Sequence, residues 1–371
     1  MALPFTMSTK ISLSKDWQML QGFFPDGWER KAKEFGALTR QRGIKDPETL
    51  MRILLIHLAD GCSLRETVVR AKLGNIAEIS DVALLKRLKK SSQWLQWIAC
   101  EMVRDMGAPV IKPEWVNGYN VRLIDATVIT EPGKTGTNWR LHYSLQLFGL
   151  SCDFLKITTP KEGESFSRIP VNKGDLLVGD RGYSTIKGIN HVLSQGGDVI
   201  VRLRNKSMVL RNMDGSVFVL LDHFSQLQYG QIGHWNVKVL NGNHEWIKLR
   251  LCAVKKSPAM AEYSMNKAKK EMKSKQQTLD PVTLELYRYF FIITSVPEEK
   301  MTQEQVLMLY QARWQIELAF KRLKSILGMG HLPKYDDESA KAWLHGKLVV
   351  AFLAQSLIDN GYFFSPWGYI L

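Results

Sequence analysis

Two aspartates lie in or at the end of strand-like apolar runs, and they restrict what the chain can fold into. Asp125 lies in the middle of the run NVRLIDATVIT, and Asp180 ends the run DLLVGD, directly before Arg181. An isolated carboxylate beside apolar packing carries a desolvation cost unless a cation, a metal ion or solvent compensates it. Asp125 is therefore either a ligand or a buried hydrogen-bonded aspartate, and Asp180 is either a ligand or the partner of Arg181.

The net charge narrows the class of partner. The 371 residues include 50 Lys and Arg against 36 Asp and Glu, which gives a net charge of +14 at pH 7. This excess favours a polyanionic partner, with nucleic acid the first expectation and an acidic membrane surface the second. A hydrophobic fraction of 45% supplies material for packed cores, so we expect a folded globular protein.

Sequence signals for export, for a membrane span and for zinc binding are weak. The first fifteen residues do not have the pattern of a secretory signal, and the apolar run 348–358 is too short to cross a bilayer. The cysteines are far apart and unpaired in spacing, which predicts a reduced cytosolic compartment and neither a zinc site nor a disulfide framework. They are Cys62, Cys100, Cys152 and Cys252.

The N-terminal third has the pattern of a helical domain. Helices are expected over 47–59 and from about residue 64, where Ser63 and Glu66 have capping-box spacing, followed by a long helical segment over 80–107. A helix, a tight turn and a helix form either a DNA-binding unit or a bundle that caps the next domain. The basic residues of a DNA-facing surface are Arg65, Arg70, Lys72, Lys86, Arg87, Lys89 and Lys90.

From about residue 117 the pattern changes to an α/β sheet layer. Three strand-like runs, a polar crossover, the run ending at Asp180, a helical segment and the run DVIVRLR follow one another. Between about 205 and 295 the sequence is again strand-like, including SVFVLLDHF, and is interrupted by the lysine-rich MNKAKKEMKSKQQ. That stretch is either a solvated helix or loop, or an arm that faces DNA.

Residues 302–329 have the pattern of one long helix that ends at Gly328. Its apolar stripe recurs at three- and four-residue steps and is expected to face the core. That stripe is Leu309, Ala312, Ile316, Phe320, Leu323 and Leu327. The polar stripe beside it is Tyr310, Arg313, Glu317, Lys321 and Lys324. Glu317 between cations is either part of a helix salt bridge or a third functional carboxylate.

Asp125, Asp180 and Glu317 together suit hard divalent cations. Mg²⁺ takes oxygen ligands, and a few carboxylates with substrate phosphate oxygens typically hold it. Two such ions can activate a water or a DNA 3′-hydroxyl on one side of a phosphorus and stabilise the leaving oxygen on the other. Phosphodiester chemistry also agrees with the positive net charge.

The helix sequence YQARWQIELAFKRLK carries a family resemblance. Its Tyr310, Arg313, Glu317 and Lys324 match in type and spacing the Tyr-Arg-Glu-Lys signature of a large group of insertion-sequence DDE transposases. That group has a ribonuclease-H-like catalytic core with a β-strand insertion between its second Asp and its Glu. The chain shows the same order, and the resemblance covers roughly residues 45 to 345.

The resemblance implies roles for individual residues. Asp125, Asp180 and Glu317 look like the catalytic triad that holds two Mg²⁺ ions, with Mn²⁺ as a substitute. Tyr310, Arg313 and Lys324 look like residues that hold phosphates next to the cut site. An aromatic on the last insertion strand, Tyr289 or Phe290, is placed to stack on a flipped base or else belongs to the core. Further DNA contacts are expected from Arg181, Arg202 and Arg204.

The expected organisation follows from these motifs. We expect an N-terminal helical DNA-binding domain over 1–116 and the first part of a ribonuclease-H-like mixed-sheet core over 117–204. A β-rich insertion over 205–295, the core helix with Glu317 over 296–346 and a helical tail over 347–371 follow. The family often has a longer tail, so the tail here is either short or truncated.

The sequence predicts a cut-and-paste DNA transposase in the bacterial cytosol or nucleoid. It would bind double-stranded terminal inverted repeats, act as a homodimer in the synaptic complex, and join 3′-hydroxyls to target DNA without a membrane partner. The alternatives are a catalytically inactive, transposase-derived DNA-binding regulator and a structure-selective nuclease of the same core fold.

Overall fold

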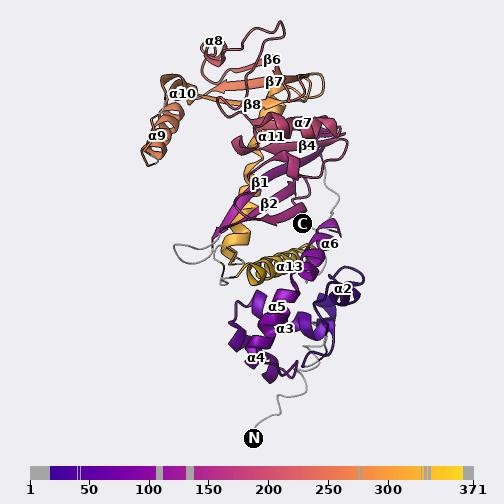
Figure 1. Cartoon of the computed structure of the whole chain (residues 1–371). Coiled ribbons are helices and arrows are strands. Elements are labelled where there is room, and N and C mark those ends of the chain that lie inside the picture. The colour runs from indigo at the N-terminus through magenta and orange to yellow at the C-terminus, as the bar shows by residue number, and fades with distance from the viewer. Residues whose placement is uncertain are drawn as a thin grey trace.

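The computed structural model places the chain in three tiers (Figure 1). N-terminal helices form one end, a mixed sheet with its covering helices forms the middle, and the strands and helices of the insertion form the other end. The described residues are 17–39, 41, 43–105, 112–130, 138–274, 276–278, 280–326, 328–329, 332 and 336–361.

The N-terminal tier consists of short capped helices. Ser63 accepts a hydrogen bond from the Glu66 backbone N–H at 3.1 Å, which confirms that a helix starts at Leu64. The prediction of one helical segment over 80–107 was wrong, because the chain turns at Ser91 between two helices. The helices are α2 (Trp28–Glu34), α3 (Pro47–Ala59), α4 (Leu64–Leu73), α5 (Asp81–Lys90) and α6 (Ser92–Asp105).

Much of the basic surface predicted for this tier is paired with nearby carboxylates. Arg70 lies 3.1 Å from Asp60 and 2.8 Å from Glu66. Other pairs join Arg65 to Asp81, Lys72 to Glu78 and Lys89 to Asp336. Such exposed pairs contribute little to stability. DNA binding by these helices stays a prediction.

One eight-stranded sheet runs through the middle and the far tier, in the order β3-β2-β1-β4-β5-β8-β7-β6. β1, β4 and β5 are mutually parallel, and every other neighbouring pair is antiparallel. The mixed α/β fold and the strand-bearing insertion are thereby confirmed. The strands are β1 (Asn120–Thr130), β2 (Asn138–Gln146), β3 (Cys152–Thr158), β4 (Asp175–Gly179), β5 (Asp198–Arg202), β6 (Ile232–Leu240), β7 (Trp246–Lys255) and β8 (Tyr289–Thr294).

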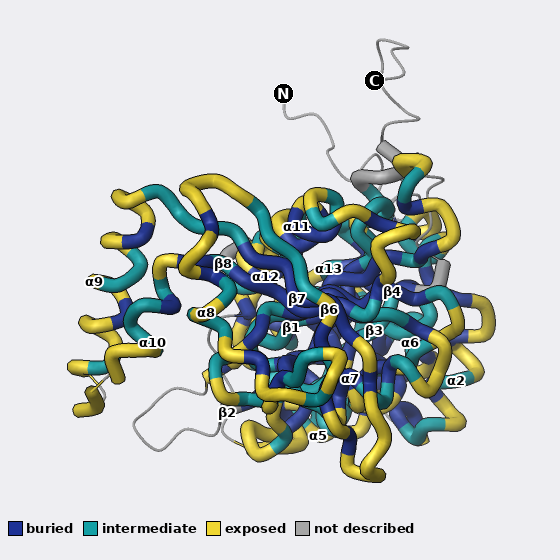
Figure 2. Tube along the Cα trace, turned by 90° about the horizontal axis from the view of Figure 1, so that it is seen from above, coloured by how far each residue is buried: buried dark blue, intermediate teal, exposed yellow. Residues whose placement is uncertain are grey.

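The insertion joins the sheet through β8 and also carries three helices. The prediction of a strand over SVFVLLDHF was wrong, because its second half forms α8 (Leu220–Phe224). An apolar run of this length fits a buried strand and a short helix equally well. The lysine-rich stretch lies in α9 (Pro258–Ser274), which projects from the body and is largely exposed (Figure 2), followed by α10 (Pro281–Leu286).

Alternating residues of the strands feed two separate cores. Leu123, Val178 and Ile200 lie on the face that packs against the C-terminal helices. A neighbouring residue in each strand, Ile124, Leu177 and Val201, belongs to a second core that includes α7 (Ile186–Ser194) and the insertion. This period of two fixes which strand residues face the C-terminal helices.

The predicted single helix over 302–329 is interrupted. It consists of α11 (Gln303–Gln311), α12 (Trp314–Lys321) and a π-helical turn (Arg322–Ile326). At the break, the N–H of Arg313 bonds to the carbonyl of Tyr310 and the N–H of Ile316 bonds to that of Arg313, so the chain tightens by one residue. α11 packs on β4 and β5, whereas α12 packs on β1.

A long final helix, α13 (Asp337–Gly361), joins the tiers. It packs against α6, α3 and α5 (Figure 1). α13 is continuous through residue 347, the boundary expected between the catalytic core and the helical tail. That boundary stays a prediction. Residues 362–371 lie outside the described part. Within the described part, no helix is both long enough and apolar enough to span a membrane.

Close approach of α13 to α3 generates a stability prediction. A Cβ added at Gly346 would lie 2.4 Å and 2.8 Å from the two methyl carbons of Leu58, which is fully buried. We expect Gly346→Ala to lower the free energy of unfolding by about 1–3 kcal/mol, because overpacking outweighs the helix propensity of alanine. Urea denaturation measures this free energy. Because Leu58→Ala removes the methyl groups that a Cβ at Gly346 would meet, the double variant Gly346→Ala/Leu58→Ala should be more stable than Leu58→Ala alone.

Candidate active site

Strand register places the two predicted aspartates side by side. Ile124, before Asp125, pairs with Gly179, before Asp180. Gly179 in turn pairs with Val201, before Arg202. Neighbouring strands are about 4.8 Å apart, so one row contains Asp125, Asp180 and Arg202. Asp125 and Asp180 follow Ile124 and Gly179, and Arg202 follows Val201; Ile124 and Val201 belong to the second core, and a Cβ on Gly179 would face Phe166 of that core. Because side chains alternate along a strand, Asp125, Asp180 and Arg202 lie on the opposite face, which α11 and α12 cover.

Local backbone contacts hold both carboxylates. Asp180 caps the 3-10 turn Arg181–Tyr183, and its Oδ1 accepts a hydrogen bond from the Gly182 N–H at 2.8 Å. Asp125 Oδ1 accepts from the N–H of the following residue at 2.8 Å. In each aspartate the bond engages one carboxylate oxygen. The sequence alternative of an ion pair between Asp180 and Arg181 is not observed among the described residues.

The break between α11 and α12 directs Arg313 into the site. Its Nη1 donates to Asp125 Oδ2 at 3.3 Å, and its Nη2 donates to Glu317 Oε1. Glu317 is thus brought toward Asp125 through a guanidinium, and its side chain remains 58% exposed, against 16% for Asp125. The helix salt bridge that the sequence left open does form, and Arg313 extends it to a strand aspartate.

A stack of alternating cations and rings continues from Arg313 across the sheet. The Arg313 guanidinium lies 5.9 Å from the Tyr310 ring, which lies 5.3 Å from the Phe290 ring. Arg202 covers Phe290 at 5.1 Å. Because each contact is a cation–π or ring–ring contact, this stack fixes the orientation of α11 over β5 and β8.

Burial makes the site electrostatically unusual. It raises the pKa of the Asp125 carboxyl to about 7, and the nearby Asp180 carboxylate adds to the increase, while the Ala126 N–H and Arg313 oppose it. Burial, with Asp180, also raises the pKa of Glu164. Carboxylates gathered in this way favour a cation between them.

A carboxylate at the other end of β4 shows the structural alternative. Asp175 is buried, and Arg122 Nη1 donates to it at 2.8 Å, with further hydrogen bonds from the Asn120 side chain and the Asn172 N–H. Asp180 has no ion-pair partner among the described residues. The two ends of the same strand thus hold one neutralised carboxylate and one that no protein cation pairs with.

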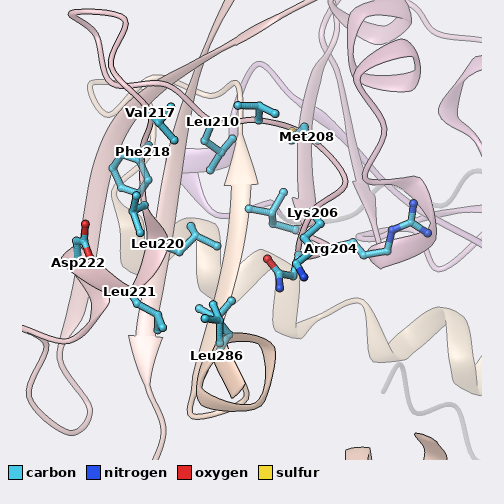
Figure 3. Close-up of a pocket in the computed structure, with 15 residues that line it drawn as sticks. Arg204, Lys206, Met208, Leu210, Val217, Phe218, Leu220, Leu221, Asp222 and Leu286 are labelled. Atoms are coloured by element: carbon cyan, nitrogen blue, oxygen red, sulfur yellow. The ribbon is translucent and has the colours of Figure 1, made fainter. Parts of the chain in front are cut away.

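Not every predicted site residue is brought to this place. Lys324 lies in the π-helical turn, half-buried, without an ion pair to a described residue. Tyr289 is buried against Phe224 on the other face of the sheet, whereas Phe290 lies on the active-site face. Arg204 is exposed and lines a cavity of about 430 Å³ within the insertion, whose other walls are mostly apolar (Figure 3).

Sequence reasoning missed Glu164, which lies beside the carboxylate pair. A Cβ on Gly182 would lie 2.0 Å from Glu164 Oε2 and 3.1 Å from Asp180 Oδ1, so the two carboxylates are neighbours and a larger residue would displace the Glu164 carboxylate. Glu164 belongs to the loop before β4, where no pattern distinguishes it from Glu162, which pairs with Arg168. Its proximity comes from the tertiary fold alone.

The donor set fits a divalent metal ion in part. Asp125 and Asp180 present hard oxygen atoms from adjacent strands, and burial penalises the negative charge of Asp125, which a cation would relieve. Within the described residues, no three His, Cys, Asp or Glu side chains converge as a metal site. Glu317 joins Asp125 only through Arg313, so its carboxylate must turn inward to become a third ligand.

Comparison with known proteins identifies the class. Residues 160–353 match the family model described as a transposase DDE domain, which includes Asp180 and Glu317. The chain belongs to this family, and its mixed α/β fold agrees with the expected ribonuclease-H-like core. The domain implies dependence on a divalent metal ion in general.

Relatives of nearly full length indicate the kind of transposase. The chain is 32% identical over 348 residues to the transposase for insertion sequence element IS421 of Escherichia coli, covering 92% of the chain and 93% of that protein. It is 32% identical over 347 residues to InsL of element IS186A of Escherichia coli (strain K12), with the same coverage. The IS231F transposase of Bacillus thuringiensis subsp. israelensis is 26% identical over 49% of the chain and 41% of its own length. The chain is an enzyme of the DDE transposase class.

Replacing aspartate by asparagine should change the stability of the protein in opposite directions at the two ends of β4. Asp180→Asn keeps an oxygen acceptor for Gly182 and removes repulsion with Asp125, so we expect stability to rise by about 1 kcal/mol. Asp175→Asn leaves the buried Arg122 with less compensation and should cost about 3 kcal/mol or more. Thermal unfolding in a buffer with EDTA measures both. A loss of stability in Asp180→Asn would show that Asp180 has a structural partner.

Proposed function

We propose that this transposase binds the terminal inverted repeats of its own insertion sequence and moves the element by a cut-and-paste route. The observation that supports the proposal is the row of Asp125 and Asp180 beneath a helix that carries Glu317. Among the described residues, no cation pairs with Asp180, whereas Arg122 pairs with Asp175. The net charge of +14 suits a double-stranded DNA substrate.

The proposed metal ligands are Asp125, Asp180 and Glu317. Two Mg²⁺ ions, or Mn²⁺ in their place, supply activation of a water or a DNA 3′-hydroxyl and stabilisation of the leaving oxygen. The protein holds Asp125 and Asp180 ready through their backbone hydrogen bonds. Glu317 is the adjustable member, since it lies on a helix surface and is largely exposed.

Arg313 has two sets of partners in this proposal. Without DNA it pairs with Asp125 and Glu317, and with DNA its fork of N–H groups binds a backbone phosphate next to the cut. The exchange releases Glu317 toward the aspartates. In this proposal, binding of a DNA phosphate by Arg313 allows Glu317 to join Asp125 and Asp180 as the third metal ligand.

The remaining proposed DNA contacts lie around this arginine. Tyr310 and Lys324 hold phosphates, and Arg181, Arg202 and Arg204 contact DNA near the site. Of the two aromatic candidates for stacking on a flipped base, the position of Phe290 beside Tyr310 favours it over Tyr289. Two copies of the chain would pair the two ends of the element in a synaptic complex.

A catalytically inactive DNA-binding regulator is the second candidate. It differs from the active enzyme in one observable property, because it occupies the repeats without cutting them. The presence of all three carboxylates and of the Tyr-Arg-Glu-Lys set favours the active enzyme.

Cleavage of labelled duplex DNA tests the proposal. The duplex carries the inverted repeat found at the ends of the element, with Mg²⁺ or Mn²⁺ present. We expect the wild type to cut at the repeat end and to join the 3′-hydroxyl to a target plasmid. Asp125→Asn, Asp180→Asn and Glu317→Gln should each lower the cleavage rate by at least about 100-fold, since each removes a metal-binding charge.

The control variant is Asp222→Asn, which makes the same change at an exposed position in the insertion. It should bind and cut like the wild type. Binding of the repeat without any cleavage by the wild type would support the regulator instead. Equal cleavage of unrelated duplexes would point to a nuclease.

A further inference from the structure

Strand register places two cations on the active-site face of the sheet, and a third cation lies in the turn beside Asp180. Arg202 of β5 follows Asp125 and Asp180 in the same row. Phe290 of β8 pairs with Val254 of β7, and Lys256 follows Val254 by two residues, so Lys256 continues the same face. Arg181 lies in the turn that Asp180 caps.

Tyr287 connects two of these cations. Lys256 Nζ donates to the Tyr287 carbonyl at 2.8 Å and to Ser264 Oγ at 3.0 Å. The Arg181 guanidinium lies 5.7 Å from the Tyr287 ring. Lys256 is thereby fixed at the base of α9, half-buried, where the insertion meets the catalytic core.

The three cations have no carboxylate partners. Among the described residues, none of Arg181, Arg202 and Lys256 forms an ion pair, and Arg181 Nε is buried without a hydrogen-bond partner. Burial lowers the pKa of Lys256 to about 8, and Arg202 and Arg181 add to the decrease. Burial, with Arg181, also lowers the pKa of Arg202. Holding like charges together costs free energy, and an anion bound between them would recover it.

We propose that Arg181, Arg202 and Lys256 form a binding site for one backbone phosphate of the DNA substrate, on the side of the catalytic aspartates toward the insertion. The proposal rests on the proposed transposase function and adds Lys256, a residue of the insertion, to the DNA-binding surface. Because Lys256 directly follows β7 of the insertion and Arg181 belongs to the catalytic core, the bound phosphate ties the insertion to the core.

Geometry favours a phosphate over a carboxylate ligand from another protein. Two guanidinium groups and an ammonium supply many N–H donors, which suits the several oxygens of a phosphodiester. Arg181 and Tyr287 also line a cavity of about 340 Å³, which Arg204, Lys206, Glu271 and Asp280 share and which Arg202 and Lys256 do not reach.

A first experiment uses inorganic sulfate, without DNA. Sulfate should raise the melting temperature of the wild type more than that of Lys256→Gln. The matched control is Lys248→Gln, the same change at an exposed lysine of the same strand, about 26 Å away at 3.3 Å per residue. The control should respond like the wild type. Equal sulfate shifts in all three proteins would overturn the proposal.

A second experiment measures DNA binding against salt concentration, with the labelled inverted-repeat duplex. Lys256→Gln should weaken binding several-fold and lower the slope of log K against log salt by about 0.9, the effect of one lost phosphate contact. Lys256→Arg should restore both, and Lys248→Gln should change neither. Circular dichroism and the melting temperature identify any variant that fails to fold, and Arg202→Gln then provides the same test.

The outcomes separate this site from the function on which it rests. If the wild type cuts the repeat and Lys256→Gln binds it with an unchanged salt slope, the phosphate site is wrong and the transposase proposal stands. If the wild type neither binds nor cuts the repeat, the function proposal fails. A reduced sulfate shift in Lys256→Gln would then still support an anion site.

Discussion

The parallel pairing of β1, β4 and β5 is the constraint on which the site depends. The register of these strands brings together residues 55 positions apart in sequence, Asp125 and Asp180, and adds Arg202 from the third strand. Slipping any strand by one residue would turn its functional side chain into the opposite core. Packing of the apolar residues on both faces therefore fixes the positions of Asp125, Asp180 and Arg202. The surrounding loops and helices pack around this row.

Arg313 sets the charge balance of that row. Its guanidinium lies between Asp125 and Glu317 and offsets the negative charge of Asp125, which burial penalises. In the proposed function this pairing is reversible, because the Glu317 side chain is largely exposed and a guanidinium binds phosphate well. Substrate DNA and metal ions would then be linked ligands: DNA that takes Arg313 away from the carboxylates would make the site more attractive to cations.

The sequence predicted the core strands and the places of Asp125 and Asp180 on them, for reasons that also explain where it failed; the role of the aspartates stays a prediction. Short β-rich runs bounded by polar residues define β1, β4 and β5 without ambiguity, and the Tyr-Arg-Glu-Lys spacing located the helix over them. The break at Arg313 has no glycine or proline to announce it, so a single helix was expected. Glu164 looks like an ordinary loop residue and Lys256 like an ordinary residue after a strand. Only the tertiary fold brings Glu164 near Asp180 and Lys256 near Tyr287 and Arg181. Contacts between distant segments carry no local signal.

The central claim is that DNA releases Glu317 from Arg313 to complete a triad with Asp125 and Asp180. A structure of the protein bound to its repeat-end duplex and Ca²⁺ tests the claim directly. Ca²⁺ is used in place of Mg²⁺ so that the DNA stays uncut. The account predicts all three carboxylates within ligand distance of metal, about 2.3–2.6 Å for Ca²⁺, with Arg313 on a phosphate. Arg313 still paired with Asp125 in the DNA complex, and Glu317 still turned to solvent, would contradict it.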